Sequence, residues 1–109
     1  MSDVIKCISP VDGSVFAERP VASEKAVAET FRKARAAQGE WSRLPTPERA
    51  KYCSAAVDAM LGMTDEIVPE LAWQMGRPVR FGAGEMKGFA ERARYMIDIA
   101  ERSLEPIDP

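Results

Sequence analysis

The most informative absence from this 109-residue chain is histidine, of which it has none. Without histidine the chain cannot form a Ser-His-Asp triad or a Cys-His pair, and it lacks the commonest metal-binding side chain. Its two cysteines lie far apart in the sequence, which argues against a disulfide scaffold and against a zinc site. Any catalysis would have to use carboxylates, lysine or a bare thiol, so we expect no catalytic residue and no metal site in this chain.

Long apolar runs and an excess of charge of one sign are also missing. No apolar run approaches the ~20 residues that span a bilayer. The first ten residues lack the charged and apolar regions of a secretion signal. The net charge is −2 and there is no basic tail, so electrostatics give no case for binding nucleic acid. These absences predict a cytoplasmic protein with neither a nucleic acid nor a membrane as its partner.

The chain does contain an orderly series of local patterns. Residues 4–21 combine β-prone segments with the pair Asp12-Gly13, which predicts a β-hairpin with its turn at or next to that pair. Four helices are predicted to follow within residues 23–102. Ser23 is the predicted N-cap of the first of them, which should run to about Gly39.

The second helix is predicted to begin where Thr46 precedes Pro47, with Thr46 as its cap. Trp41 should pack between this helix and the first. Cys53 falls in the apolar stripe of the second helix, so we expect a small, buried and inert side chain there. Cys7, in the first strand, is expected to be inert as well.

The third helix is predicted over residues 65–75 and the fourth over about 79–102, with a loop at 103–109. Pro69 falls one turn inside the third helix, which predicts a late or irregular start for it. Gly76 fits the left-handed position that ends a helix, and Pro78 prevents its continuation. We expect the four helices to pack as two antiparallel pairs.

Three glycines inside the fourth helix, Gly82, Gly84 and Gly88, have no such local explanation. Gly84 and Gly88 stand four residues apart and therefore share one face of the helix. They could permit close packing of another backbone, or simply lack a side chain there. Alternatively, they could leave an open wall for a bound ligand.

A series of short motifs resembles the N-terminal segment of the NAD(P)-dependent aldehyde dehydrogenase family. The motifs are SPVDGSVFAERPVAS, AVAETFRKARAAQGEWSRLPTPERA, QMGRPVRFGAGEM and ARYMIDIAER. The matching residues include Trp41, Pro47, Glu48, Arg49, Gly76, Pro78, Gly84 and Glu85. Ser9, Asp12 and Ser14 stand where the family has asparagine, threonine and glutamate, and Arg77 replaces a lysine.

The resemblance implies a mainly α segment, a hairpin and four helices, that forms a single partial domain over residues 1–109. Family members are several times longer, and their nucleophilic cysteine, general-base glutamate and Rossmann cofactor segment lie beyond the part that this chain resembles. Neither Cys7 nor Cys53 matches the nucleophile's motif. The complete enzyme would use NAD or NADP and oxidise an aldehyde to a carboxylic acid, whereas this chain is expected to bind no cofactor and to be inactive alone.

The resemblance also bears on the unexplained glycines. In the family the helix at this position forms one wall of the aldehyde entrance tunnel, and by motif position Gly84 and Gly88 fall on that wall. Small residues there would widen the channel for bulky aldehydes.

Three interpretations of function remain open at the level of sequence. The first is an enzyme segment, inactive alone. The second is a stand-alone helical module for oligomerisation without catalysis, and the third is a small-ligand binder that uses the glycine-lined face. Because apolar faces that suit burial against a larger body would otherwise be exposed, we expect a homo-oligomer, namely a dimer, in which helices could be exchanged between the two chains.

Overall fold

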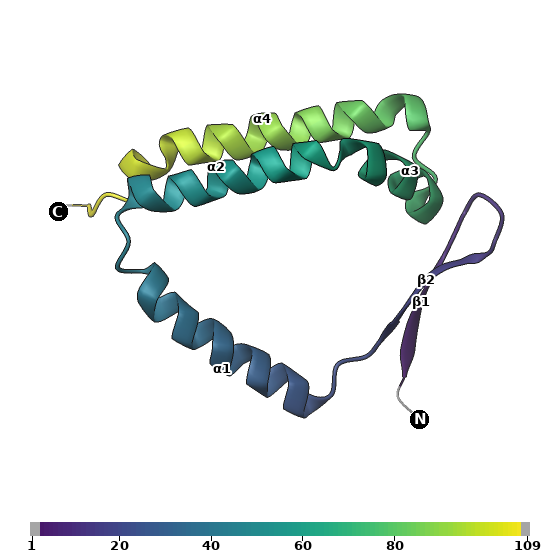
Figure 1. Ribbon diagram of the computed structural model, residues 1–109, viewed down its shortest axis with the longest axis horizontal. Coiled ribbons are helices and arrows are strands. Elements are labelled where there is room, and N and C mark those ends of the chain that lie inside the picture. Colours follow the sequence, from purple (N-terminus) through teal and green to yellow (C-terminus); the bar gives the residue numbers. More distant parts are fainter. Residues whose placement is uncertain (1–2, 108–109) are drawn as a thin grey trace.

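A two-stranded hairpin followed by four helices makes up the computed structural model, which describes residues 3–107 (Figure 1). The strands are β1 (Val4–Ile8) and β2 (Val15–Pro20), and the helices are α1 (Glu24–Trp41), α2 (Thr46–Gly62), α3 (Thr64–Met75) and α4 (Val79–Ser103). The predicted mainly α fold with an N-terminal hairpin is therefore confirmed. Within the described residues no helix is both long and apolar enough to cross a membrane.

The hairpin turn forms at the predicted pair. Gly13 adopts a φ of +77°, in the left-handed region that glycine tolerates without strain, and its amide donates to the carbonyl oxygen of Ser9 at 2.9 Å. Asp12 Oδ1 accepts from the hydroxyl of Ser14 at 2.7 Å and from its amide at 2.9 Å. These two hydrogen bonds favour the carboxylate and lower the pKa of Asp12.

The main helical layer consists of α4 lying against both α2 and α3. Helix α3 follows α2 almost without interruption, and α4 runs back along the pair (Figure 1). Among residues 3–107, the buried apolar side chains are Val57 in α2 and Met86 and Ala90 in α4. This small apolar core stabilises the packing of α4 on α2 and α3, but it does not include α1 or the hairpin.

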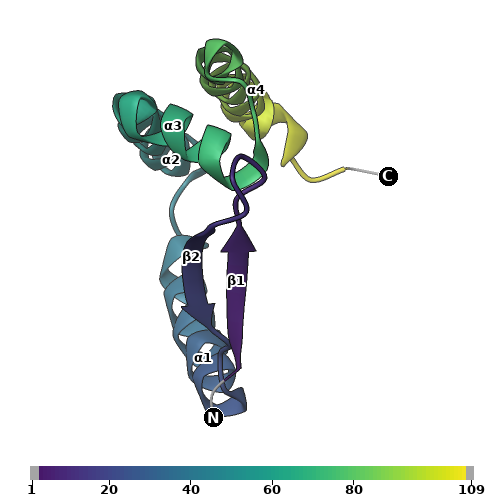
Figure 2. The same cartoon turned by 90° about the vertical axis from the view of Figure 1, so that its right-hand side faces the viewer.

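Helix α1 stands apart from that layer. Its N-terminus is capped as predicted, because the hydroxyl of Ser23 accepts from the amide of Ala26 at 3.2 Å. None of its residues is buried, and Phe31 on its apolar face is 74% exposed. Figures 1 and 2 show α1 and the hairpin extending from the same side of the α2–α4 layer. The prediction of two antiparallel helix pairs is therefore wrong, because α4 packs on two helices and α1 is left over.

Three predicted helix boundaries are also wrong. Helix α1 continues past Gly39 to Trp41, because glycine inside a helix weakens it without ending it. Helix α2 begins at Thr46, and Pro45 rather than Thr46 occupies the N-cap in an extended conformation. Helix α3 begins at Thr64 without irregularity, although it contains Pro69. Pro69 is exposed, so the carbonyl that loses its amide partner faces water, which reduces the cost.

The tip of the hairpin meets the turn between α3 and α4. Gly76 has a φ of +73°, which confirms the predicted left-handed helix end. A Cβ at Gly76 would lie 3.1 Å from Cγ of Pro10 in the hairpin loop. On the adjoining strand, the sulfur of Cys7 lies 3.9 Å from the backbone oxygen of Gln74. The glycine thus serves both the turn and the hairpin contact.

The fold leaves an unusually large surface exposed. The chain of 12.0 kDa has an accessible area of 9044 Å² and extends over 56 × 40 × 27 Å. A compact monomer of this mass exposes about 6,000 Å². The excess, about 3,000 Å², is surface that a compact fold of the same mass would bury.

Candidate functional site

Gly84 and Gly88, the residues predicted to line a substrate channel, lie on the outer face of α4. The residues that α4 buries, Gly82, Met86 and Ala90, occupy the opposite side of the helix, toward α2 and α3. A Cβ at either Gly84 or Gly88 would have no heavy atom within 4 Å. Neither glycine therefore permits a close contact within the described part of the chain, and together they leave an open strip on the helix.

Gly82 is the glycine that permits close packing. A Cβ there would lie 3.0 Å from Cγ2 of Val68 and 3.1 Å from its Cβ, and closer still to Cγ1. The absence of a side chain at Gly82 lets α3 approach α4 at this point. The three glycines of one helix thus divide into one that is required for packing and two that are not.

The first turns of α4 are braced by charged side chains. Arg77, in the turn before the helix, forms an ion pair with Glu85. The guanidinium groups of Arg77 and Arg80 lie 5.5 Å and 4.8 Å from the ring centroid of Phe81. Because all four side chains are substantially exposed, this cluster orients the start of α4 more than it stabilises the fold.

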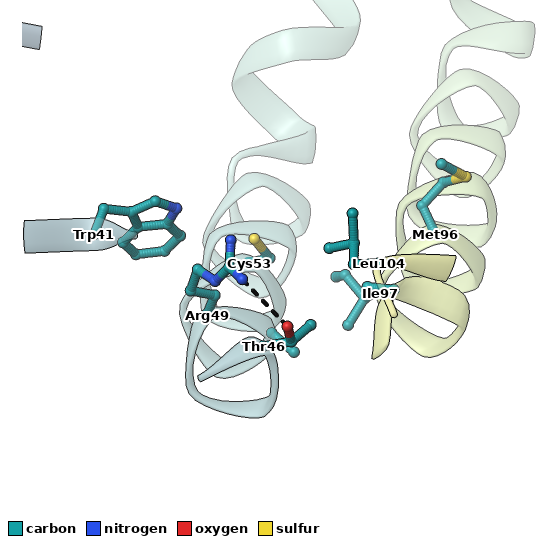
Figure 3. A pocket seen from close by; sticks show the side chains of 9 residues that line it. Trp41, Thr46, Arg49, Cys53, Met96, Ile97 and Leu104 are labelled. Carbon is teal, nitrogen blue, oxygen red and sulfur yellow. Dashed lines mark hydrogen bonds between the residues drawn. The ribbon is translucent and has the colours of Figure 1, made fainter. Parts of the chain in front are cut away.

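A cleft of about 270 Å³ opens between the start of α2 and the last turns of α4 (Figure 3). Its walls are mainly apolar and are formed by Trp41, Thr46, Arg49, Ala50, Cys53, Met96, Ile97, Ala100 and Leu104. Trp41 reaches it from the end of α1, and its ring meets that of Tyr52 edge to face with centroids 5.7 Å apart. Trp41 therefore contacts the second helix through Tyr52, as predicted, but it remains 38% exposed and does not anchor a buried interface between α1 and α2.

Arg49 is the one charged residue in the wall of this cleft. Its Nη2 donates to the hydroxyl of Thr46 at 3.2 Å, while its Nε is buried without a hydrogen-bond partner among residues 3–107. Figure 3 shows the guanidinium between Trp41 on one side and Ile97 and Leu104 on the other. Sequence analysis matched Arg49 to a family motif but missed the cleft, because Trp41 and Leu104 meet around it only through the tertiary fold.

The exposure of Cys53 differs from the sequence prediction. Both cysteines are free, and Cys7 is half-buried in β1. Cys53 is exposed, so the prediction of a buried side chain is wrong for this chain. The apolar stripe to which it belongs faces partly into the open cleft, where none of the described helices covers it.

Comparison with known proteins agrees with this geometry. Residues 1–107 match the aldehyde dehydrogenase family. A 3,6-anhydro-alpha-L-galactose dehydrogenase of Streptomyces coelicolor is 33% identical over 81 residues, which are 74% of this chain and 16% of that protein. An NADP(+) succinate-semialdehyde dehydrogenase of Deinococcus radiodurans is 27% identical over 99 residues, 91% of this chain and 21% of that protein.

A similar chain occurs among solved structures. The crystal structure of an NAD-dependent benzaldehyde dehydrogenase from Corynebacterium glutamicum superposes with a TM-score of 0.85 at 26% identity. The match covers 98% of this chain and 23% of that chain. The present chain thus spans about a fifth of the length of its relatives. It belongs to the aldehyde dehydrogenase family, and it corresponds to the N-terminal segment of such an enzyme.

Proposed function

We propose that this chain contributes the N-terminal segment of an NAD(P)-dependent aldehyde dehydrogenase and is inactive by itself. The proposal rests on one observation, the fold shared with a solved dehydrogenase at a TM-score of 0.85 over 98% of the chain. In the complete enzyme, a thiolate attacks the aldehyde, a hydride passes to NAD(P), and hydrolysis of the thioester releases the acid. This segment supplies part of the scaffold around that chemistry.

The surroundings of the two thiols support inactivity of the isolated segment. Cys7 lies beside the backbone oxygen of Gln74, and Cys53 lies in a mainly apolar cleft. A nucleophilic thiol is commonly activated by a neighbouring general base, and the chain has no histidine to act as that base for either cysteine. The two free cysteines also accord with our proposal of a reducing, cytoplasmic location.

The test compares two proteins: the 109-residue chain and the complete product of the gene that encodes it. Each is supplied with NAD or NADP and a panel of aldehydes, and reduction of the nicotinamide is followed by absorbance. We expect turnover by the complete product and none by the 109-residue chain. Turnover by the short chain, or none by a folded complete product with any aldehyde, would refute the proposal.

We further propose that Gly84 and Gly88 form a wide part of the aldehyde channel in the complete enzyme. A Cβ added at either glycine would have no heavy atom within 4 Å, so α4 itself leaves room for a side chain to begin there. We expect Gly88→Met to lower kcat/KM for bulky aldehydes more than for small ones, because the new side chain narrows the channel. Gly39→Met on α1, also an open position, is the matched control. Equal losses with small and bulky aldehydes would contradict the channel assignment.

The alternative is a stand-alone helical module that oligomerises without catalysis. The observation that favours it is the exposed apolar face of α1, where Val27 is 49% and Phe31 74% exposed. We propose that the isolated chain forms a homodimer, and α1 is the helix that could be exchanged because it buries no residue. Light scattering over a range of concentrations tests this, and a monomer at the highest concentration would contradict it. A stable dimer together with a stop codon directly after the Pro109 codon would favour the stand-alone module over the enzyme segment.

A further inference from the structure

We propose that Arg92 of α4 is a specificity-determining residue that binds a carboxylate on the aldehyde substrate of the complete enzyme. The inference rests on the proposed function, and it names the class of aldehyde that the channel along α4 accepts: an apolar or aromatic body that carries a negative charge away from the reacting carbon. Three properties of α4 support it. They are two hollows beside Arg92, the pairing of the other charges around them, and the place of Arg92 one turn after Gly88.

Arg92 lies between two adjoining hollows on the exposed surface of α4. One hollow has a volume of about 410 Å³ and is lined by Glu85, Phe89, Arg92, Ala93 and Met96. The other has a volume of about 380 Å³ and is lined by Glu91, Arg92, Tyr95 and Met96. Both volumes lie within the roughly 300–1,000 Å³ of small-molecule sites. The exposed aromatic and thioether side chains of the two hollows offer contact area to an aromatic or apolar ligand.

The carboxylates around these hollows already have cationic partners. Glu85 forms an ion pair with Arg77, and a carboxylate oxygen of Glu91 lies 3.8 Å from the ammonium nitrogen of Lys87. Among residues 3–107, no ion pair includes Arg92. The net charge that the hollows offer to a ligand is therefore the positive charge of Arg92. A guanidinium binds a carboxylate through two parallel hydrogen bonds, which select the orientation of the ligand as well as its charge.

The position of Arg92 relative to Gly88 connects it with the proposed channel. Arg92 follows Gly88 by one helical turn, so the two residues share a face of α4. Because the Cα–Cβ bonds of a helix tilt toward its N-terminus, the side chain of Arg92 is directed over the turn that contains Gly88. A Cβ at Gly88 would have no heavy atom within 4 Å. The open turn therefore leaves room for a ligand beside the guanidinium.

The experiment compares two aldehydes of nearly the same size and shape, para-formylbenzoate, which is anionic, and para-formylbenzamide, which is neutral. Each is supplied to the complete gene product with NAD or NADP, and kcat/KM is measured. Arg92→Gln should lower kcat/KM for the anionic aldehyde about tenfold more than for the neutral one, because charge-assisted hydrogen bonds are lost. The loss should appear in KM rather than in kcat, since the carboxylate is bound equally in the ground state and the transition state.

Two further variants serve as comparisons. Arg92→Lys keeps the charge but loses the paired geometry of the guanidinium, so it should retain part of the preference for the anion, and it remains informative if Arg92→Gln fails to fold. Arg102 is an exposed arginine of the same helix, about 15 Å further along its axis. Charges that far apart are largely screened at physiological ionic strength, so Arg102→Gln should leave the ratio of the two kcat/KM values unchanged.

The outcomes separate this inference from the proposed function. An active complete product in which Arg92→Gln leaves the ratio of kcat/KM values unchanged would overturn the role of Arg92, while the enzyme assignment would stand. An equal fall in the ratio with Arg92→Gln and Arg102→Gln would also overturn it, because net charge alone would explain the preference. If the complete product oxidises no aldehyde, calorimetric binding of terephthalate decides the question. Binding about tenfold weaker in Arg92→Gln would support the carboxylate site, whereas equal binding or none would overturn it.

Discussion

Gly82 offers the sharpest test of how α3 and α4 pack. A Cβ at this position would lie 3.0 Å from Cγ2 of Val68 and 3.1 Å from its Cβ, with Cγ1 nearer still. Such distances are below van der Waals contact, and three atoms of one short, branched side chain are involved. Val68 cannot move away by bending a flexible end, so Gly82→Ala must push the two helices apart or twist Val68 from its rotamer.

The expected size of the effect is the difference between two opposing contributions. Extra volume in a packed contact costs about 1–3 kcal/mol. Replacing glycine by alanine inside a helix increases the free energy of unfolding by about 1 kcal/mol. Gly82→Ala should therefore change the free energy of unfolding by between about zero and a loss of 2 kcal/mol. Gly84→Ala meets no atom within 4 Å and should raise it by about 0.5–1 kcal/mol.

The assay is urea unfolding of the 109-residue chain followed by circular dichroism, with Gly84→Ala and Gly88→Ala as matched controls on the same helix. A second background, Val68→Ala, removes the branch that a Cβ at Gly82 would meet. In that background Gly82→Ala should become stabilising, like its controls, and the cycle should show a coupling of about 1 kcal/mol or more. If Gly82→Ala stabilises the original chain as much as Gly84→Ala does, the close packing inferred at Gly82 is refuted.

Three further predictions follow from local geometry. Gly76→Ala should lower the free energy of unfolding by about 1–2 kcal/mol, because the positive φ disfavours an L side chain; an unchanged urea midpoint would contradict this. Ser23→Ala should cost α1 about 1 kcal/mol and speed amide hydrogen exchange within that helix, whereas exchange in α2 and α4 should stay constant. The lowered pKa of Asp12 means that its contribution to stability is present above the unfolded-state pKa and is lost as the pH falls through the folded-state value. Ser14→Ala removes the hydroxyl donor and should raise the pKa of Asp12 in an NMR titration, and a constant pKa would show that the hydroxyl hydrogen bond does not perturb it.

Local stereochemistry explains the predictions that succeeded. The left-handed conformation at Gly13 and Gly76 is one that glycine adopts without strain, so glycine beside a turn residue or at the end of an apolar helix pattern is informative by itself. The same holds for Ser23, whose short hydroxyl can reach the amide three residues on. Each of these features depends on residues within one turn of the chain.

The predictions that failed depend on what covers a helix. Cys53 carries the sequence signature of a buried position, yet no described residue buries it and it is exposed. The apolar face of α1 likewise predicts a partner helix, but α1 buries nothing. An amphipathic pattern indicates which face is suited to burial and contains no information about which segment will cover it. This chain spans about a fifth of its relatives' length. The apolar faces of Cys53 and α1 therefore predicted burial that the described residues do not provide.

The glycines around α4 show how far sequence alone can separate structural from functional roles. Gly76 is required by a backbone angle, Gly82 by the methyl groups of Val68, and Gly84 and Gly88 by neither. Neither backbone conformation nor packing within the described chain requires glycine at Gly84 or Gly88. Each of these glycines therefore lowers helix stability by about 1 kcal/mol relative to alanine without any compensating contact. A loss of helix stability that no local contact offsets is expected where function constrains the surface of a helix. If alanine at Gly84 and Gly88 stabilises the complete enzyme while reducing turnover of bulky aldehydes, the channel is the reason for these glycines; if it stabilises without affecting any aldehyde, they are a tolerated weakness of α4.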